Sequence, residues 1–188
     1  MLQLQKYLQK YLFTMSTNEY GTNKKLEIKV CYLGIGSNIG DRLKNLKNSI
    51  KFLGSEAGKI TKYSKIYETE PWGLIDQNQF LNQAVEIKTT HNPNELLNIC
   101  KKIEKKMGRN YTRKWGERII DIDILYYSSD IIKKNKLIIP HKFIQDRKFV
   151  LIPLNDINKN YIHPLLMKSN FELLKKCHDN SKIIEYGN

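Results

Sequence analysis

The segment Ile119–Tyr127, which reads IIDIDILYY, limits the fold more than any other part of this chain. Side chains along a β-strand point alternately to the two faces of its sheet. Three of its isoleucines therefore share one face, which predicts their burial in a core. Asp121 and Asp123 share the opposite face, roughly 6.5–7 Å apart along the strand. The segment thus predicts a sheet with one buried apolar face and an acidic pair on the other.

The remaining patterns predict an α+β fold. Further strands are expected at Ile28–Ile35, Lys59–Thr69, Phe80–Lys88 and Lys136–Ile139, the last pairing with Ile119–Tyr127 through a turn near Lys134. Helices are expected from Asp41 to Gly54, from Pro93 to Gly108, from His141 to Pro153 and over Asn170–His178. Because strands and helices do not alternate regularly as βαβ units, we expect a mostly antiparallel sheet flanked by helices.

Capping residues in the sequence indicate where two of the helices begin. Asp41 is expected to cap the first helix, because its carboxylate can accept from amides of the first turn. Asn92, Pro93 and Glu95 form a capping box with proline at the first helical position. We expect residues 26–188 to form one domain, and residues 1–25 to be an extension that the domain does not need.

The composition limits the class of protein. The chain has 188 residues and a net charge of +13, which indicates anionic partners: nucleic acid, an anionic membrane surface or phosphorylated small molecules. Lys, Asn and Ile are frequent throughout the chain, so a general compositional bias is favoured over nucleic-acid binding as the source of this charge. Three widely spaced cysteines and four histidines without ligand spacing predict neither a disulfide framework nor a zinc site. No apolar run reaches the roughly 18–20 residues of a membrane span. We therefore expect a cytoplasmic protein without a membrane partner.

The acidic pair has two interpretations. Alone, Asp121 and Asp123 could be a solvated strand face paired with lysines. Their surroundings favour a metal instead, because a surplus of cations lies nearby in the sequence: Arg109, Arg113, Lys114, Arg118, His141 and Arg147. Mg²⁺ typically takes one or two carboxylates and completes its shell with water and phosphate oxygens. Mg²⁺ and a triphosphate between the acids and the cations would balance these charges, as phosphoryl-type transfer requires.

A second group of residues indicates a site for a flat heterocycle. Phe80 and Asn82 are two residues apart on one predicted strand and share a face. A buried Asn needs partners for its donors and acceptor, which an amide-like ring edge can supply. Other aromatic and polar residues that can contribute are Thr69, Pro71, Trp72, Trp115 and Phe149. The glycine-rich stretch Gly34–Gly40 lacks the pattern of a nucleotide-binding loop, and we interpret it as a tight turn.

Together these segments resemble the hydroxymethyldihydropterin pyrophosphokinase family. The similar stretches are YLGIGSN at 32–38, YETEPWG at 67–73, QFLNQAV at 79–85, GR followed by KWGERIIDIDIL within 108–125, and IPHKFIQDRKFVLIPL at 139–154. The resemblance implies a ferredoxin-like α+β fold and transfer of pyrophosphate from ATP to a reduced pterin in folate biosynthesis, giving AMP. It also implies small-molecule substrates, with no nucleic acid and no obligate protein partner.

The resemblance also implies roles for individual residues. Asp121 and Asp123 would hold two Mg²⁺ ions, with Arg109 and Arg118 in a loop that closes over the reactants. Residues expected at the ATP site are Glu104, Arg118, His141 and Arg147. Residues expected at the pterin are Thr69, Trp72, Phe80, Asn82 and Phe149, with Phe80 and Phe149 stacking on the ring. Two alternatives remain open from the residues alone: a basic nucleic-acid-binding module, and another metal-dependent nucleotidyl transferase or nuclease.

Overall fold

The computed structural model describes residues 27–74, 76–109, 116–134 and 136–187. Helices and strands follow one another in this order: β1 (Lys29–Ser37), α2 (Arg42–Glu56), β2 (Lys59–Tyr63), β3 (Tyr67–Thr69), β4 (Phe80–Thr89), α3 (Pro93–Lys106), β5 (Asp121–Tyr127), β6 (Ile132–Lys134), β7 (Leu137–Ile139), the short 3₁₀ helix η1 (Ile144–Asp146), α4 (Lys148–Asn158), α5 (Asn170–Lys176) and β8 (Ile183–Glu185).

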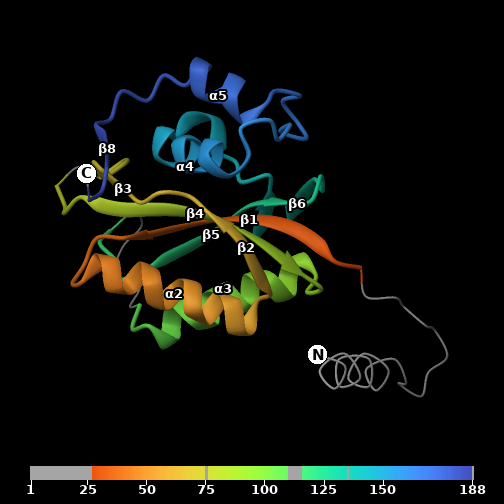
Figure 1. Cartoon of the computed structure of the whole chain (residues 1–188), viewed down its shortest axis with the longest axis horizontal. Coiled ribbons are helices and arrows are strands. Elements are labelled where there is room, and N and C mark those ends of the chain that lie inside the picture. The colour runs from red at the N-terminus through yellow and green to blue at the C-terminus, as the bar shows by residue number, and fades with distance from the viewer. Residues whose placement is uncertain (1–26, 75, 110–115, 135, 188) are drawn as a thin grey trace, which may run out of the picture.

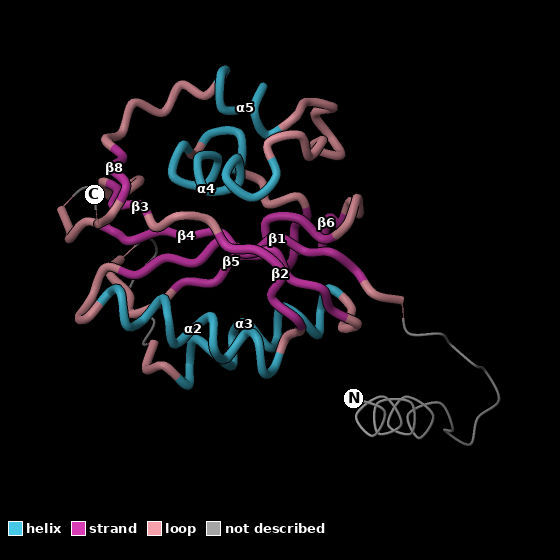
Figure 2. Tube along the Cα trace, in the orientation of Figure 1, coloured by secondary structure: helices cyan, strands magenta, loops and turns pink. Residues whose placement is uncertain are grey.

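The main sheet is antiparallel and lies between two layers of helices. Its strand order is β5-β1-β4-β3-β8, and β2 pairs with β4 next to β3. Helices α2 and α3 cover one face, while α4 and α5 cover the other (Figures 1 and 2). With β2 and β3 counted as one interrupted strand, the chain runs β-α-β-β-α-β with its first strand central, so the predicted α+β, ferredoxin-like fold is confirmed.

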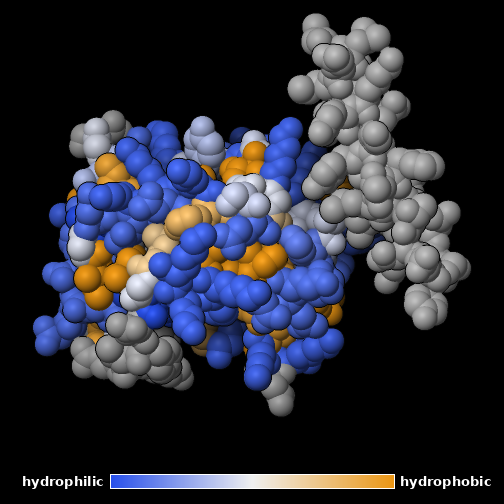
Figure 3. Space-filling view, turned by 90° about the horizontal axis from the view of Figure 1, so that it is seen from below, coloured by the Kyte–Doolittle hydropathy of each residue, from blue (hydrophilic) through white to orange (hydrophobic). Residues whose placement is uncertain are grey.

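Apolar side chains form a core on each side of the sheet. The isoleucines at 120, 122 and 124 pack with residues of α2 and α3, which confirms the expected burial of this strand face. On the other face Tyr126 and Leu125 pack against α4 and α5. Seen from the side of α2 and α3, the surface is largely hydrophilic (Figure 3). Within the residues that the structure describes, no helix combines the length and the apolar character needed to cross a bilayer.

Both predicted helix caps are confirmed. The Asp41 side chain accepts from the backbone N–H of Lys44 at 2.9 Å. Asn92 accepts from two amides of the first turn of α3, and Glu95 accepts from the backbone N–H of Asn92 at 2.8 Å. Helix α3 thus begins where the sequence indicated, and it carries Glu104 in its last turns.

Several predicted element bounds were wrong. The expected strand Lys59–Thr69 is split at Ser64. The Ser64 hydroxyl oxygen accepts from the backbone N–H of Ala84, and this bond interrupts the backbone ladder between the strands. The segment after Lys136 pairs with β6 in a local hairpin and not with β5. Helix α2 continues past Gly54, a residue that weakens a helix interior without ending it.

The helix expected over His141–Pro153 is also different. It begins at Lys148, after the η1 turn, and continues through Pro153 to Asn158. Proline removes one helical hydrogen bond, but here burial of the ring and of the neighbouring Leu151 and Leu154 outweighs that loss. The last helix ends at Lys176, two residues before the expected end.

Candidate active site

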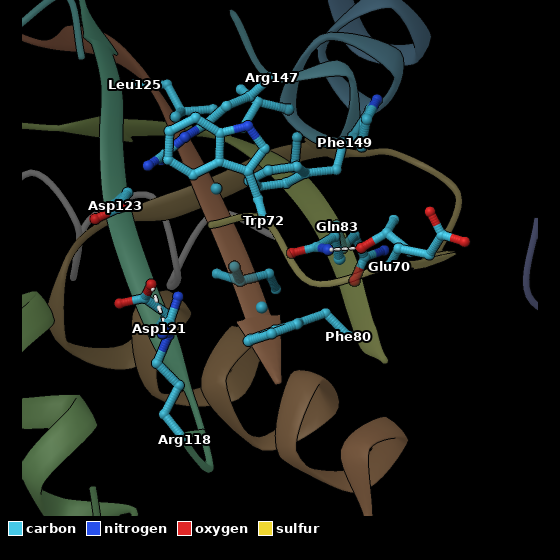
Figure 4. Close-up of a pocket in the computed structure, with 18 of the residues that line it drawn as sticks. Glu70, Trp72, Phe80, Gln83, Arg118, Asp121, Asp123, Leu125, Arg147 and Phe149 are labelled. Carbon is cyan, nitrogen blue, oxygen red and sulfur yellow. Dashed lines mark hydrogen bonds and ion pairs between the residues drawn. The ribbon is translucent and has the colours of Figure 1, made fainter. Parts of the chain in front are cut away.

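Asp121 and Asp123 extend from β5 toward the same side of the sheet (Figure 4). Strand β5 pairs with β1, where Gly36 lies opposite Asp121 and Gly34 opposite Asp123. The absence of side chains at these two glycines leaves room beside the carboxylates. The acidic pair is therefore accessible from the centre of the sheet.

Asp121 is bound by two arginines. Nη1 of Arg109 lies 2.6 Å from Oδ1 of Asp121, and Nε of Arg118 lies 2.9 Å from its Oδ2. Burial alone would raise the pKa of Asp121, but Arg118 and Arg109 more than offset it and hold that pKa below its usual range. Asp121 is thus a stable anion in the ligand-free chain.

Asp123 lies in a different electrostatic environment. Burial, and then the charge of Asp121, raises its pKa above the usual range. Nε2 of His141 lies 4.0 Å from Oδ2 of Asp123, and burial lowers the pKa of this imidazole below its usual value. Binding of a cation beside the pair would relieve the repulsion between the two acids.

Glu104 is buried in α3, next to strand β5. Its carboxylate accepts from the backbone N–H of Ile122 at 2.8 Å and lies 2.6 Å from Nη1 of Arg109 and 2.9 Å from Nζ of Lys101. Burial raises the pKa of Glu104 despite these two cations. This carboxylate fixes both β5 and Arg109, so its geometry is that of a positioning group.

A first cavity opens next to the aspartates and is bordered by residues from five parts of the chain. Nδ2 of Asn82 donates to Oγ1 of Thr69 at 2.7 Å, which fixes the Asn82 amide at the cavity wall. The cavity is bordered by nine of the predicted site residues: Thr69, Trp72, Phe80, Asn82, Arg118, Asp121, Asp123, Arg147 and Phe149. It therefore has aromatic walls, three side-chain amides (Gln77, Asn82 and Gln83) and an acidic end.

Arg147 is a buried cation surrounded by aromatic rings. Its guanidinium lies 4.5 Å from the ring centre of Trp72, 4.8 Å from that of Phe143 and 5.6 Å from that of Phe149. The residue is only 9% exposed, and its Nε has no hydrogen-bond partner within the described part of the chain. Burial lowers its pKa. A buried guanidinium with free donor capacity is suited to bind an anion.

A second cavity lies on the other side of Asp123. It is bordered by apolar residues of α3, β5 and β7 together with three lysines and His141: Leu97, Lys101, Ile122, Asp123, Ile124, Lys136, Leu137, Ile138, His141 and Lys142. Asp123 borders both cavities. Two separate ligands, one in each cavity, can therefore reach the same carboxylate.

The structure brings most predicted site residues together and adds others that the sequence did not reveal. The lysines of the second cavity and the close approach of Gly36 to Asn82 depend on strand register, which no single motif encodes. The sequence predicts Lys136 and Leu137 only as part of a strand. Arg113, Lys114 and Trp115 lie outside the described residues.

The donor set at the acidic pair fits Mg²⁺. Within the described residues, no three His, Cys, Asp or Glu side chains converge to form a metal cluster. Two neighbouring carboxylates are the hard oxygen ligands that Mg²⁺ takes from proteins when phosphate and water supply the rest. The two aspartates can thus supply the protein ligands of a Mg²⁺ site whose remaining ligands come from phosphate and water.

Comparison with known sequences decides between the open alternatives. The model of the family described as 7,8-dihydro-6-hydroxymethylpterin-pyrophosphokinase (HPPK) matches residues 32–159. The chain belongs to the HPPK family. This membership favours the pyrophosphokinase interpretation over a nucleic-acid-binding module or a nuclease.

Two bacterial relatives in the HPPK family are similar to this chain over most of their length. The chain is 44% identical over 137 residues to a 2-amino-4-hydroxy-6-hydroxymethyldihydropteridine pyrophosphokinase of Aquifex aeolicus, covering 73% of this chain and 85% of that one. It is 46% identical over 129 residues to the enzyme of the same name from Bacillus subtilis, covering 68% and 77%. Similarity also extends to a folate synthesis bifunctional protein of Arabidopsis thaliana, at 44% identity over 126 residues, covering 66% of this chain and 26% of that protein.

A solved structure shares the fold. The Plasmodium falciparum HPPK-DHPS A437G protein with STZ-DHP superposes with a TM-score of 0.66 at 20% identity, covering 85% of this chain and 47% of that one. The chain spans about half of that larger protein. At this identity the likeness shows the fold alone.

Proposed function

We propose that this protein transfers the terminal diphosphate of ATP to the hydroxymethyl group of 6-hydroxymethyl-7,8-dihydropterin, giving AMP and the pterin diphosphate in folate biosynthesis. Membership of the HPPK family and the names of its relatives support this activity. The observation that carries it in the structure is the pair of cavities that share Asp123. A reaction between two substrates requires such a meeting point.

The first cavity is the proposed pterin site. The edge of a pterin carries amide-like donors and acceptors, which match the carboxamide of Asn82 and the backbone near Thr69 and Trp72. Phe80 and Phe149 border the same cavity, and their rings would stack on the two faces of the heterocycle. In this position the hydroxymethyl group would extend toward the acidic end of the cavity.

The second cavity is the proposed ATP site. Its apolar walls suit the adenine ring, and its lysines suit the phosphates. His141 and Arg147 lie on either side of Asp123 and would contact the triphosphate as it passes the acidic pair. Glu104 would support this site indirectly, because it holds Arg109 and the backbone of β5.

Asp121 and Asp123 would hold Mg²⁺, two ions in our expectation. When bound, Mg²⁺ would screen the phosphate charges and make the β-phosphorus a better electrophile. Arg109 and Arg118, now bonded to Asp121, would share their donors with phosphate oxygens and neutralise charge as the diphosphate moves. The pterin hydroxyl oxygen forms the new bond to the β-phosphorus, the bond to the α-phosphate oxygen breaks, and AMP leaves. The hydroxyl proton would leave to water, because attack on a phosphate whose charge is neutralised requires no dedicated side-chain base.

The remaining expectations are part of the same proposal. Small molecules are the expected partners, without nucleic acid, membrane or an obligate protein partner. A cytoplasmic location and a single domain over residues 26–188 stay predictions. The extension at residues 1–25 lies outside the described residues.

Product analysis tests the proposed function. The protein is incubated with ATP, Mg²⁺ and the reduced pterin, and nucleotides are separated by chromatography. We expect AMP in equal amount to the pterin diphosphate, and none without the pterin. ADP as the main product would instead indicate transfer of a single phosphoryl group. Release of AMP without pterin would indicate a hydrolase.

A further inference from the structure

The chain after α5 contacts both walls of the first cavity. We call residues 179–186 the C-terminal strap. These residues lie beyond the match to the HPPK family model, which ends at residue 159. The strap follows α5, passes the N-terminal end of α4 and joins the edge of the main sheet as β8 (Figure 1).

At its first residue the strap caps helix α4. Oδ2 of Asp179 accepts from the backbone N–H of Lys148 at 2.9 Å. The residue at the helix's own N-cap position is Arg147, whose side chain makes no capping hydrogen bond. The cap is therefore supplied from 31 residues away, and its negative charge also suits the N-terminus of a helix. The first turn of α4 carries Phe149, and Arg147 immediately precedes it.

At its other end the strap is joined to the opposite wall. Ile183 pairs with Thr69 in the β3–β8 ladder. Beyond the ladder, the backbone N–H of Lys182 donates to Oε2 of Glu70 at 3.0 Å, and the backbone N–H of Glu70 donates to the carbonyl of Lys182 at 3.3 Å. These bonds fix the chain between Thr69 and Trp72.

The strap also lies behind Trp72. Trp72 borders the first cavity on one side and, on the other, a separate cavity that is bordered by His178 and Asp179. Trp72 thus lies between the first cavity and the residues at the start of the strap. Its position depends on a loop that the strap holds at Glu70.

We propose that the C-terminal strap is a positioning element for the pterin site, which sets the distance between the wall at Thr69–Trp72 and the wall at Arg147–Phe149. This inference rests on the proposed function, because it takes the first cavity as the pterin site. Asp179 and the backbone of Lys182 are the two attachment points. Neither touches the substrate, so they act through the residues that they hold.

Binding of 6-hydroxymethylpterin, the stable oxidised analogue, tests the strap by calorimetry on the full chain. Asp179→Ala removes the cap, whereas Asp179→Asn keeps an oxygen that can accept from Lys148. A lower population of the competent pocket weakens apparent affinity in proportion. We expect Asp179→Ala to raise the Kd of the pterin by roughly 2- to 30-fold, the span of a lost helix cap. Asp179→Asn should restore most of the affinity, and the Kd of an ATP analogue should change less than about twofold in both.

A matched control separates positioning from general loss of stability. Asn92→Ala removes the cap of α3, which packs on the other face of the sheet. It should lower the free energy of unfolding by an amount similar to Asp179→Ala, roughly 1 kcal/mol. Its pterin Kd should stay unchanged. Equal effects of the two variants on pterin affinity would overturn the proposal.

A second pair of variants tests the other attachment point. Lys182→Pro removes the N–H that bonds Glu70, while Lys182→Ala keeps it. We expect weaker pterin binding only in Lys182→Pro. If the strap acts as one unit, the double variant Asp179→Ala/Lys182→Pro should have about the same pterin Kd as the single variant with the higher Kd. Two results would overturn the strap proposal: additive losses of pterin affinity in the double variant, or an unchanged pterin Kd in both Asp179→Ala and Lys182→Pro.

Failure of the proposed function gives a different result. If the unmodified protein binds no 6-hydroxymethylpterin and forms no AMP with the reduced pterin, the first cavity is not a pterin site. If the unmodified protein binds the pterin and the strap variants bind it equally well, only the strap proposal is wrong.

Discussion

Replacement of Gly36 by alanine should disable the proposed pterin site while leaving the fold intact. Gly36 lies in β1 between Asn82 of β4 and Asp121 of β5. A Cβ at this position would be 2.6 Å from Oδ1 of Asn82, a distance that real Cβ atoms do not tolerate. The Asn82 amide must therefore turn away, and it loses its hydrogen bond of 2.7 Å to Thr69.

The size of the effect follows from the bonds that are lost. Asn82 is buried, so a displaced amide loses its contact with the pterin and leaves donors or acceptors without partners. Such a loss costs about 1–3 kcal/mol. This corresponds to roughly a 5- to 150-fold increase in the Kd of the pterin, since 1.4 kcal/mol is about tenfold. ATP binding should change little, because its proposed cavity does not include Gly36.

Gly54→Ala in α2, on the other face of the sheet, is the matched control. Its added Cβ would be 3.8 Å from the side chain of Ile60, which is ordinary contact. Calorimetric titration with 6-hydroxymethylpterin and with an ATP analogue measures both variants. Normal pterin affinity in Gly36→Ala, or an equal loss in Gly54→Ala, would refute the role given to the Asn82 amide.

Three further variants have distinct expected results. Asp123→Ala should abolish AMP formation while the pterin still binds in a titration, and normal turnover would contradict the role of the acidic pair. Asn82→Ala should raise the Kd of the pterin about 10- to 100-fold with ATP affinity nearly unchanged; equal loss of both would argue against the two-cavity assignment. Burial acts to raise the pKa of Glu86, but bonds from Thr61 and Lys62 outweigh it and lower that pKa below 4.5. The ionised form therefore adds stability above the ordinary pKa, and this is lost as pH falls through the lowered value. Urea unfolding should find Glu86→Gln less stable than the unmodified protein at pH 7, with a difference that shrinks below about pH 4; a constant difference would exclude the ionic contribution.

The parts of the fold that depend on local chemistry were predictable. Alternation in IIDIDILYY fixed which face of β5 is buried, and the side chains of Asp41 and Asn92 marked the starts of α2 and α3. The acidic pair and the shared face of Phe80 and Asn82 also follow from spacing, because residues two apart on a strand share a face. The other residues around the first cavity were expected only from the resemblance to the family.

The parts that depend on distant partners were not predictable. The break at Ser64 exists because its hydroxyl bonds β4, and the pairing of β7 with β6 is a choice between two possible partners. Pro153 lies inside a helix because its surroundings in the core compensate the lost bond. Asp179 caps α4 from the far end of the chain, a contact for which the local sequence carries no signal.

A crystal structure with Mg²⁺, a non-hydrolysable ATP analogue and 6-hydroxymethylpterin tests the central claim most directly. The account predicts divalent ions in contact with both Asp121 and Asp123 and with phosphate oxygens, and the pterin against Asn82. Ions bound away from these carboxylates, or a pterin in the cavity bordered by Leu97 and Lys136, would contradict it.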